Sequence, residues 1–394
     1  MNVLVIANRQ PDPRGKGDAK IAWLAKDALL ADGHTVFVAV PPAVSPVSKT
    51  IGAAAALVSG APLQVGVTRS RRLGDDIDQI LRSNDIDVIV AVHTRTAHYV
   101  PKERRVRSIA FLYDSCALGY ATYAGRLPYW TDAVFRLEQR RMMNVERAIL
   151  AEFGRVAVLA HPDRRYLEAL SSLTAPIVQV PYAVDLAYFS QTVRRPVAGP
   201  PLFMFVGRLG YIPNQDAVRQ LVTRVWPAIR TRWPRARLRV VGAGPSRDLR
   251  QLLASRNVEL AADVEDVRKE LEEATALMVP MRLGTGVQTK VLEAMASGVP
   301  VICSGFANAG INAAPGEHLL VADSPQEYVA AAQRLIEEPA FAENLVAGAR
   351  RWVLDQHAPA VFNANFIRLC SEVARRTVQS VSRPVTQTQS LGVR

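Results

Sequence analysis

The chain shows two successive series in which short apolar runs alternate with amphipathic stretches. The first series opens with an apolar run at 2–7, a polar loop, a stretch of helical period at 19–31 and a second apolar run at 35–40. Strands buried on both faces read as continuous apolar runs, whereas the helices that connect them repeat with a period near 3.6 residues. This order predicts a βαβ unit, the building block of a parallel sheet.

The alternation continues to the middle of the chain. Two apolar runs that end at His93 and Asp114 are predicted strands, and ligands of open parallel sheets lie beyond such strand ends. A long amphipathic helix at 129–152 has arginines alternating with Glu138 and Glu146, which is typical of a solvated, ion-paired face. The other elements predicted in this part are strands at 63–67, 156–160 and 176–180 and helices at 75–82 and 161–170.

A stretch rich in proline and glycine at 191–201 separates the two series and predicts a linker. In the second series, Asn214 is the predicted N-cap of the first helix and Ser324 that of a later one. Strands are predicted at 202–207, 238–242, 257–262, 277–281, 299–303 and 318–323.

The chain is therefore predicted to be an α/β protein with two domains. The expected divisions are an N-terminal domain at 1–190, a C-terminal domain at 202–358, a last helix at 359–376 and a polar, disordered tail at 377–394.

The loop at 284–290 has the composition of an anion-binding site. Gly284 and Gly286 allow positive φ and a bare backbone, so that successive N–H groups can converge on a charged group. The helix that follows points its N-terminus at the same place, with Lys290 as a point charge and Glu293 as an acceptor for two neighbouring hydroxyls. Phosphate donors beside a hydroxyl acceptor suggest a nucleotide sugar. The alternative is a purely structural loop, since glycine loops before helices are common.

The run K-V-L-E-A-M-A-S-G-V-P-V at 290–301 closely resembles the C-terminal-domain motif of GT-B glycosyltransferases of family 4. The opening βαβ unit, with Gly15 and Gly17 in its loop, resembles the first unit of the same family. This resemblance implies a GT-B fold, in which two Rossmann-like parallel-sheet domains face a cleft and the last helix crosses back onto the N-terminal domain. It also implies transfer of a sugar, with retention, from a UDP- or GDP-linked donor to a hydroxyl acceptor, without a metal or other cofactor.

The resemblance and the strand ends together predict the site residues. His93, Arg208 and Lys290 are the catalytic candidates, because charge builds on the departing phosphate and family members carry a histidine near the donor sugar. His93 is alternatively a satisfied loop histidine. Lys16 and Asp114 are acceptor-side candidates, and Asp114 is alternatively a cap. The predicted donor-binding residues are Gly15, Gly17, Gly207, Arg208, Gly242, Gly244, Gly284, Thr285, Gly286, Val287, Lys290 and Glu293.

Three departures from the family pattern are visible. Thr285 stands where many members carry an acid, and Asn214 stands where they carry a lysine. Tyr182 and Ala183 replace an Asn-Gly pair in the motif that leads out of the first domain. The neutral residues at 285 and 214 leave open a non-catalytic sugar-nucleotide-binding scaffold. A nucleotide-sugar 2-epimerase of the same fold is the other alternative, but it would need acid/base side chains clustered at the cleft, and too few are visible.

Charge and cysteine content bear on the binding partners and the cellular compartment of the protein. The formal net charge is +12, but 48 basic and 36 acidic residues are interspersed, which favours a solvated surface. The alternative is a weak attraction to an anionic membrane or a phosphorylated acceptor, and no nucleic-acid partner is expected. The three cysteines are far apart, which suggests free thiols. With no secretory signal at its start, the protein is expected in the cytoplasm, with peripheral association at the inner face of the membrane as an option.

A metal-dependent mechanism has weak support. The D-x-D matches at 76–78 and 85–87 lie in a predicted helix and just before a predicted strand, where neither follows a strand as a metal site requires. No cluster of histidine, cysteine and glutamate with ligand spacing is visible. The most apolar stretch, which starts at Ile51, is well below the roughly 20 residues that span a bilayer.

Overall fold

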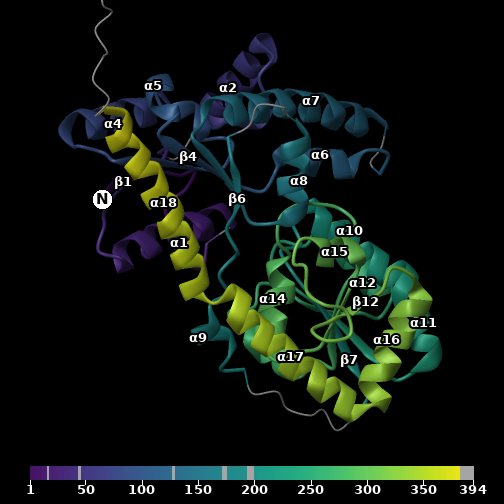
Figure 1. The fold of residues 1–394 in the computed structure, drawn as a ribbon. Coiled ribbons are helices and arrows are strands. Elements are labelled where there is room, and N and C mark those ends of the chain that lie inside the picture. The colour runs from purple at the N-terminus through teal and green to yellow at the C-terminus, as the bar shows by residue number, and fades with distance from the viewer. Residues whose placement is uncertain (16, 43–45, 127–128, 171–174, 193–198, 382–394) are drawn as a thin grey trace, which may run out of the picture.

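The computed structural model describes residues 1–15, 17–42, 46–126, 129–170, 175–192 and 199–381, without the side chains of 376–381. Within them the chain forms two α/β domains that lie one above the other, bridged on one side by the two C-terminal helices (Figure 1). No helix among the described residues has both the length and the apolar character to cross a bilayer.

The N-terminal domain is built on a six-stranded parallel sheet in the order β2-β1-β3-β4-β5-β6. Every residue of β3 is buried, as expected for a strand covered by helices on both faces. The strands are β1 (Asn2–Ile6), β2 (Thr35–Ala39), β3 (Val88–Val92), β4 (Ser108–Tyr113), β5 (Arg155–Val158) and β6 (Ile177–Gln179). The helices are α1 (Gly17–Ala31), α2 (Pro46–Ser59), α3 (Leu63–Gly66), α4 (Arg71–Ser83), η1 (Ala97–Tyr99), α5 (Lys102–Arg105), α6 (Cys116–Tyr123), α7 (Tyr129–Glu152), α8 (His161–Leu170) and α9 (Leu186–Phe189).

The C-terminal domain repeats this plan with the order β12-β11-β10-β7-β8-β9, again parallel throughout. Its strands are β7 (Leu202–Val206), β8 (Arg237–Val241), β9 (Glu259–Ala261), β10 (Ala276–Val279), β11 (Val301–Cys303) and β12 (Leu320–Val321). Its helices are α10 (Ile212–Gln220), η2 (Leu221–Val225), α11 (Trp226–Arg232), α12 (Arg247–Ser255), α13 (Val267–Glu272), α14 (Thr289–Ala296), α15 (Gly305–Ala309), α16 (Pro325–Glu337) and α17 (Pro339–His357). Ser324 is the N-cap of α16, as predicted, and forms a capping box with Glu327.

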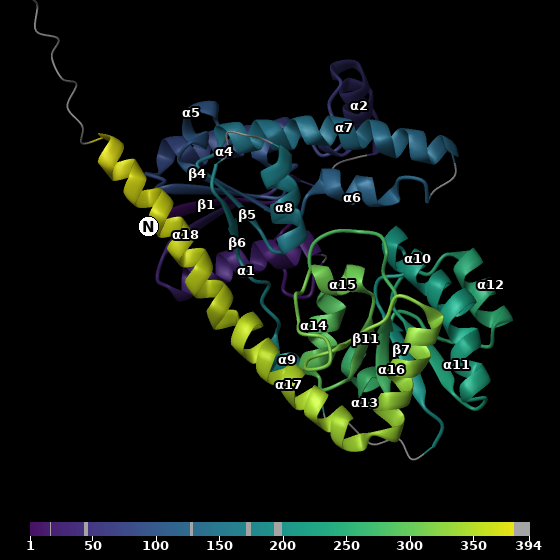
Figure 2. The same cartoon turned by 45° about the vertical axis from the view of Figure 1, so that its right-hand side comes forward.

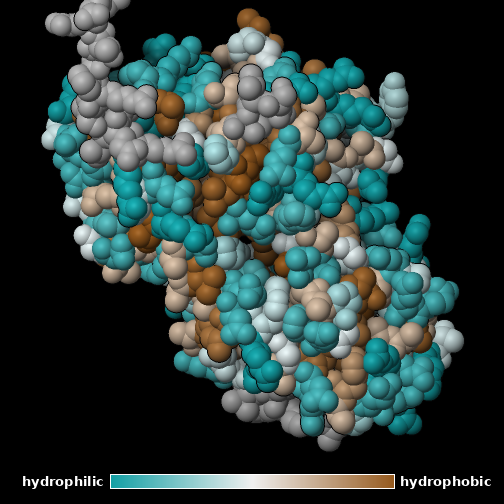
Figure 3. All heavy atoms as spheres, viewed as in Figure 1, coloured by the Kyte–Doolittle hydropathy of each residue, from teal (hydrophilic) through white to brown (hydrophobic). Residues whose placement is uncertain are grey.

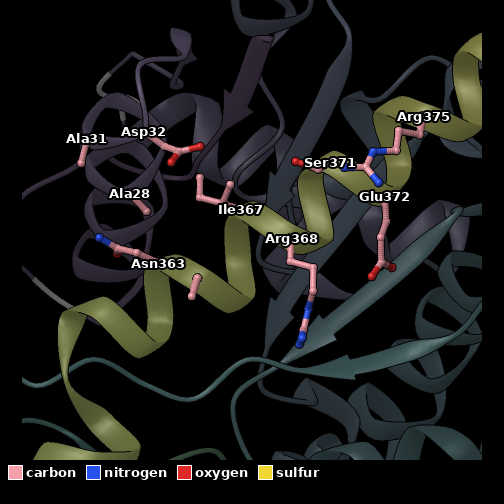
Figure 4. Close-up of a pocket in the computed structure, with 10 residues that line it drawn as sticks. Ala28, Ala31, Asp32, Asn363, Ile367, Arg368, Ser371, Glu372 and Arg375 are labelled. Carbon is pink, nitrogen blue, oxygen red and sulfur yellow. The ribbon is translucent and has the colours of Figure 1, made fainter.

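The last helix, α18 (Pro359–Val381), crosses from the C-terminal domain back to the N-terminal domain (Figure 2). Phe362 and Phe366 stack on Phe111 of β4, with ring centroids 6.3 and 5.6 Å away. Ile367 lies between α18 and α1 at a shallow groove of about 620 Å³, where Ala28 also faces the interface (Figure 4). This packing confirms the crossing predicted from the family resemblance. The helix continues five residues past 376, and 382–394 of the predicted tail lie outside the described residues.

The strand predicted at 63–67 is wrong, because Leu63–Gly66 forms the short helix α3. The Leu63 amide at the N-terminus of α3 donates to Glu138 of α7 at 2.7 Å. This backbone N–H is thus paired with a side chain distant in sequence, whereas in a strand it would pair with a neighbouring strand. Gly66 packs on the backbone of α2: an added Cβ would lie 2.4 Å from the Gly52 carbonyl oxygen. A helix–helix contact this close accounts for the glycine that resembled part of a strand.

Asn214 is not the N-cap of α10, which is Tyr211; Asn214 lies in the first turn. Its Nδ2 atom donates to the carbonyl of Arg208 at 2.9 Å, so the side chain ties the loop after β7 to the helix. The solvated face predicted for Glu138 and Glu146 is also wrong. Both carboxylates are buried, because α7 packs these positions against α3 and α6 instead of water.

Candidate functional site

A cleft of about 750 Å³ separates the carboxyl ends of the two sheets. Its N-terminal wall comes from the loop after β1, the start of α1 and the ends of β3 and β4. The C-terminal wall comes from the loops after β7, β8 and β10. This is the position where ligands of parallel α/β sheets bind. Figure 3 shows apolar and polar side chains mixed along the surface between the two domains.

Most of the predicted site residues lie at this cleft, and several lie behind it. Those that line it are Gly15, Gly17, Asp114, Gly207, Arg208, Gly242, Thr285, Gly286 and Val287. His93, Gly244, Gly284, Lys290 and Glu293 are not among the lining residues. Lys16 lies outside the described residues. The lining residues that the sequence analysis missed include Arg9, Arg14, Asp18, Lys20, Arg95 and Tyr211.

Arg208 presents its exposed side chain to the cleft from the loop after β7. The structure records no acidic partner for it among the described residues. The backbone of this loop packs closely against the loop after β8. Gly242 has a φ of +152°, and an added Cβ there would lie 1.9 Å from the Gly207 carbonyl oxygen. Only glycine fits at position 242. The guanidinium of Arg208, without an acidic partner among the described residues, can bind an anion.

The glycine loop before α14 contacts the N-terminal domain through two of its amides. Gly284 N donates to Oγ1 of Thr122 at 3.0 Å, and Gly286 N donates to Oδ2 of Asp163 at 3.0 Å. For the amides of Thr285 and Val287, the described part of the chain shows no partner. In this arrangement these two amides, both at the cleft, remain available to an anion.

Lys290 is half-buried behind the loop, with its Nζ atom 2.9 Å from Oε1 of Gln288 and 5.7 Å from the ring centre of Phe205. Burial lowers the pKa of Lys290 to about 8, against a smaller opposing effect of Glu293. An added Cβ on Gly207 would lie 3.1 Å from the Lys290 Cε atom, so the side chain runs directly beneath the loop that carries Arg208. The positive charge of Lys290 therefore lies next to the cleft and is only partly balanced by Glu293.

Glu293 forms an interdomain ion pair, with its Oε1 atom 3.5 Å from Nζ of Lys20 on α1. Lys20 also lies 5.4 Å from the ring centre of Tyr182. Burial by itself lowers the pKa of Lys20, but Tyr182 and Glu293 outweigh it and raise that pKa overall. Tyr182, which replaces the asparagine of the family motif, therefore contributes to the cationic wall of the cleft. The sequence analysis noted Tyr182 as a departure from the family motif, but nothing in the sequence indicated Lys20 as a residue of the cleft.

His93 is 5% exposed and has a φ of 81°, a conformation that few side chains adopt. Its Nε2 atom is 3.0 Å from Nη2 of Arg95, and its Nδ1 atom accepts from the Arg95 amide at 3.1 Å. Burial, together with Arg95 and Arg9, holds the pKa of His93 well below its usual range. The neutral ring thus contacts Arg95, and Arg95 is the residue of this pair that faces the cleft.

Three carboxylates meet beside the glycine loop: Asp163 and Glu146 are buried, and Asp114 is half-buried. Asp114 accepts a hydrogen bond from Oγ1 of Thr285 at 3.4 Å. Asp163 accepts from Ser115 N at 2.7 Å, and Glu146 accepts from the Ser115 hydroxyl at 2.9 Å. Asp163 lies in the first turn of α8, which follows β5, whereas Asp114 directly follows β4. Glu146 had no sequence signal of burial.

Burial dominates the electrostatics of this group. It raises the pKa of Asp163 to about 6 and that of Glu146 to about 7. Burial, with Asp163 and Glu146 nearby, raises the pKa of Asp114 well above its usual range. A carboxyl at the cleft that holds a proton near neutral pH can donate as well as accept a hydrogen bond. Among the described residues, no group of three or more histidine, cysteine or acidic side chains is arranged to hold a metal ion.

Comparison with known proteins identifies the enzyme class. The sequence model of the family described as "Glycosyl transferases group 1" matches residues 200–338. The chain is a glycosyltransferase. Glycogen synthase of Mycobacterium tuberculosis (strain CDC 1551 / Oshkosh) is 27% identical over 301 residues, which are 72% of this chain and 67% of that protein.

Solved structures confirm the GT-B fold of this glycosyltransferase. Sucrose-phosphate synthase from Thermosynechococcus elongatus aligns with a TM-score of 0.71 and 16% identity over 97% of this chain and 100% of that one. HepE of Anabaena, in complex with UDP and glucose, aligns with a TM-score of 0.63 and 12% identity over 94% and 99%. A trehalose-6-phosphate structure from E. coli, bound with UDP-2-fluoro glucose, aligns with a TM-score of 0.64 and 14% identity over 95% and 99%.

Proposed function

We propose that this glycosyltransferase moves a sugar from a nucleotide-diphosphate donor to a hydroxyl of a saccharide, lipid-linked saccharide or small molecule. The observation that carries the proposal is the position of Arg208, which faces the cleft without an acidic partner among the described residues; Thr285 and Val287, whose amides have no partner there, line the same cleft. Arg208 and these amides receive the diphosphate as the glycosidic bond breaks, and Lys290 adds its charge from beneath. HepE with UDP and glucose supports a UDP-linked donor.

The remaining roles are assigned to residues that line the cleft or lie directly behind it. Glu293 accepts the ribose hydroxyls and exchanges its contact with Lys20 for them. Arg95, held by His93, and Asp114 face the acceptor and donor sugar. The reaction needs no metal, and the sugar keeps its anomeric configuration because the leaving phosphate removes the acceptor proton on the same face. We place this activity in the synthesis of a polysaccharide, a glycolipid or a glycosylated natural product, in the cytoplasm.

The test is a panel of UDP- and GDP-sugars with the purified full chain, with and without EDTA. We expect thermal stabilisation by one nucleotide family and slow release of its nucleotide into water, unchanged by EDTA. Interconversion of sugars without nucleotide release would indicate the epimerase of the same fold, and binding without any turnover, acceptor extracts included, would indicate the scaffold. The group 1 match and the transferase relatives favour neither alternative.

A further inference from the structure

The N-terminal domain carries an apolar helix that is almost entirely uncovered. Of the residues of α2, only Ala56 is buried, although the helix contains Val47, Ile51, Leu57 and Val58. Val58 is 91% exposed. The helix is attached through Gly52, whose backbone contacts Gly66 of α3. An apolar helix that packs through one narrow strip in water signals a surface with a partner.

The first half of α7 presents a second apolar face. Tyr129 and Trp130 are 90% and 73% exposed, and Val134 and Leu137 continue the face at helical spacing. The opposite side of the same turns points inward, where Phe135 packs on Tyr120 and Tyr123 of α6. An amphipathic helix normally buries its apolar side, whereas this one has apolar residues on both sides.

Both helices lie away from the C-terminal domain. In the two cartoon views α2 and α7 lie at the far end of the N-terminal domain, with α6 between α7 and the C-terminal domain (Figures 1 and 2). The space-filling view shows apolar residues at the tip of α2, at the top of the molecule (Figure 3).

Basic residues border these apolar residues. Lys49 on α2, Arg126 in the segment after α6, and Arg136 and Arg140 on α7 are exposed. Arg136 pairs with Asp132 at 2.7 Å, whereas Arg140 has no acidic partner within the described part of the chain. Aromatic and aliphatic side chains flanked by arginines are typical of helices that lie in the interface of an anionic bilayer. A protein partner of this chain would need a matching acidic rim around an apolar centre, while an anionic bilayer supplies both.

We propose that α2 and the first half of α7 form a membrane-docking surface for an anionic lipid bilayer. The surface consists of Val47, Ile51, Leu57, Val58, Tyr129, Trp130, Val134 and Leu137, with Lys49, Arg126, Arg136 and Arg140 at its border. The side chains enter the headgroup region, and the arginines meet lipid phosphates.

The docking surface connects to the cleft through a single helix. Phe135 packs on α6, and Thr122 of α6 accepts from the Gly284 amide at 3.0 Å. A bilayer on the docking surface is therefore separated from the glycine loop by α7 and α6. Resting on the proposed function, this places lipid-linked hydroxyls, rather than soluble sugars, as the acceptor class.

The experiment is co-sedimentation of the full chain with vesicles of phosphatidylcholine, with and without about one third phosphatidylglycerol. We expect binding to the anionic vesicles that falls with added salt. Trp130→Ser with Val134→Ser should weaken it about tenfold or more, and Arg140→Gln about fivefold. Leu354→Ser, which removes an exposed leucine of α17 in the C-terminal domain, is the matched control and should bind as the unaltered chain does.

Equal binding of the double variant and the unaltered chain would overturn the proposal, as would an absence of binding to either vesicle. Self-association that depends on Trp130 and Val134 would assign the surface to a second copy and equally overturn it. Donor hydrolysis in solution needs no vesicle, so its absence would refute the proposed function while leaving the docking result intact.

Discussion

The Oδ2 atom of Asp163 accepts a hydrogen bond from the Gly286 amide at 3.0 Å, across the boundary between the two domains. Its Oδ1 atom accepts from Ser115 N within the N-terminal domain. One buried carboxylate thus holds the glycine loop of one domain against the other and decides which loop amides face the cleft.

Asp163→Ala should destabilise the protein, because it leaves the buried Ser115 amide and the partly buried Gly286 amide without an acceptor. Each unpaired group costs about 1–3 kcal/mol, partly offset by removal of a buried charge. Urea unfolding measures the change, and Asp163→Asn, which keeps one acceptor oxygen, should lose less. Hydrogen exchange at the Gly286 amide should accelerate in the alanine variant, and unchanged exchange would show that Asp163 does not hold the loop.

The stability of the unaltered protein should fall as pH rises from about 4 to about 6 relative to that of Asp163→Asn. The pKa of Asp163 in the folded protein is raised to about 6 by burial, above the ordinary value of 3.8. The folded state therefore binds the extra proton, and its contribution is present below pH 4 and lost as pH passes 6. Parallel stability curves for the two proteins would contradict this assignment.

Arg208→Ala should slow sugar transfer by about tenfold or more, because a charge-assisted hydrogen bond to the leaving phosphate contributes about 1.5–3 kcal/mol. Steady-state kinetics with the donor identified in the panel provides the measurement. Arg208→Lys retains the charge without the paired donors and should fall between. Arg224→Ala, an exposed arginine of η2, is the control. A normal rate in Arg208→Ala would remove this residue from the catalytic set.

Donor affinity should weaken as pH rises through about 8. The pKa of Lys290 is lowered to about 8 by burial, so the empty protein loses this positive charge in that range. A bound diphosphate favours the charged form, and donor binding should take up a proton near pH 8. Isothermal titration calorimetry in buffers of different ionisation enthalpy detects that proton.

Lys290→Met is the matching control for the pH dependence. It should abolish the change in affinity around pH 8 and weaken binding about tenfold at neutral pH. Without donor, the Lys290→Met variant should be at least as stable as the unaltered protein, since methionine has a size similar to lysine and removes a partly buried charge. A pH dependence that persists in Lys290→Met belongs to another group.

Glu293→Ala should weaken donor binding but change the unfolding free energy of the empty protein by no more than about 1 kcal/mol, because the pair with Lys20 is partly exposed and long at 3.5 Å. A double-mutant cycle with Lys20→Met separates the ion pair from the ribose contact. Strong coupling in the empty protein and none in donor binding would make Glu293 a structural residue.

The local pattern of residues predicted much of the fold and part of the site. The alternation of apolar runs and helical periods predicted both parallel sheets, because strand burial and helix amphipathicity are written in neighbouring residues. The same holds for the glycine loop and α14, and for the position of Arg208 and Asp114 at strand ends. The strand predicted at 63–67 failed because a distant partner, Glu138, and a glycine contact with α2 decided its conformation.

What the sequence by itself determined is the fold and the general location of the site, since both follow from short-range periodicity and from backbone freedom at glycine. Only the tertiary structure decided which groups face the cleft. Gly286 and Asp163, 123 positions apart, meet because the domains close on each other. His93 lies behind Arg95, and Glu146 of an apparently solvated helix is buried. Such contacts depend on how two separately formed domains pack together, and no local pattern of residues encodes that arrangement.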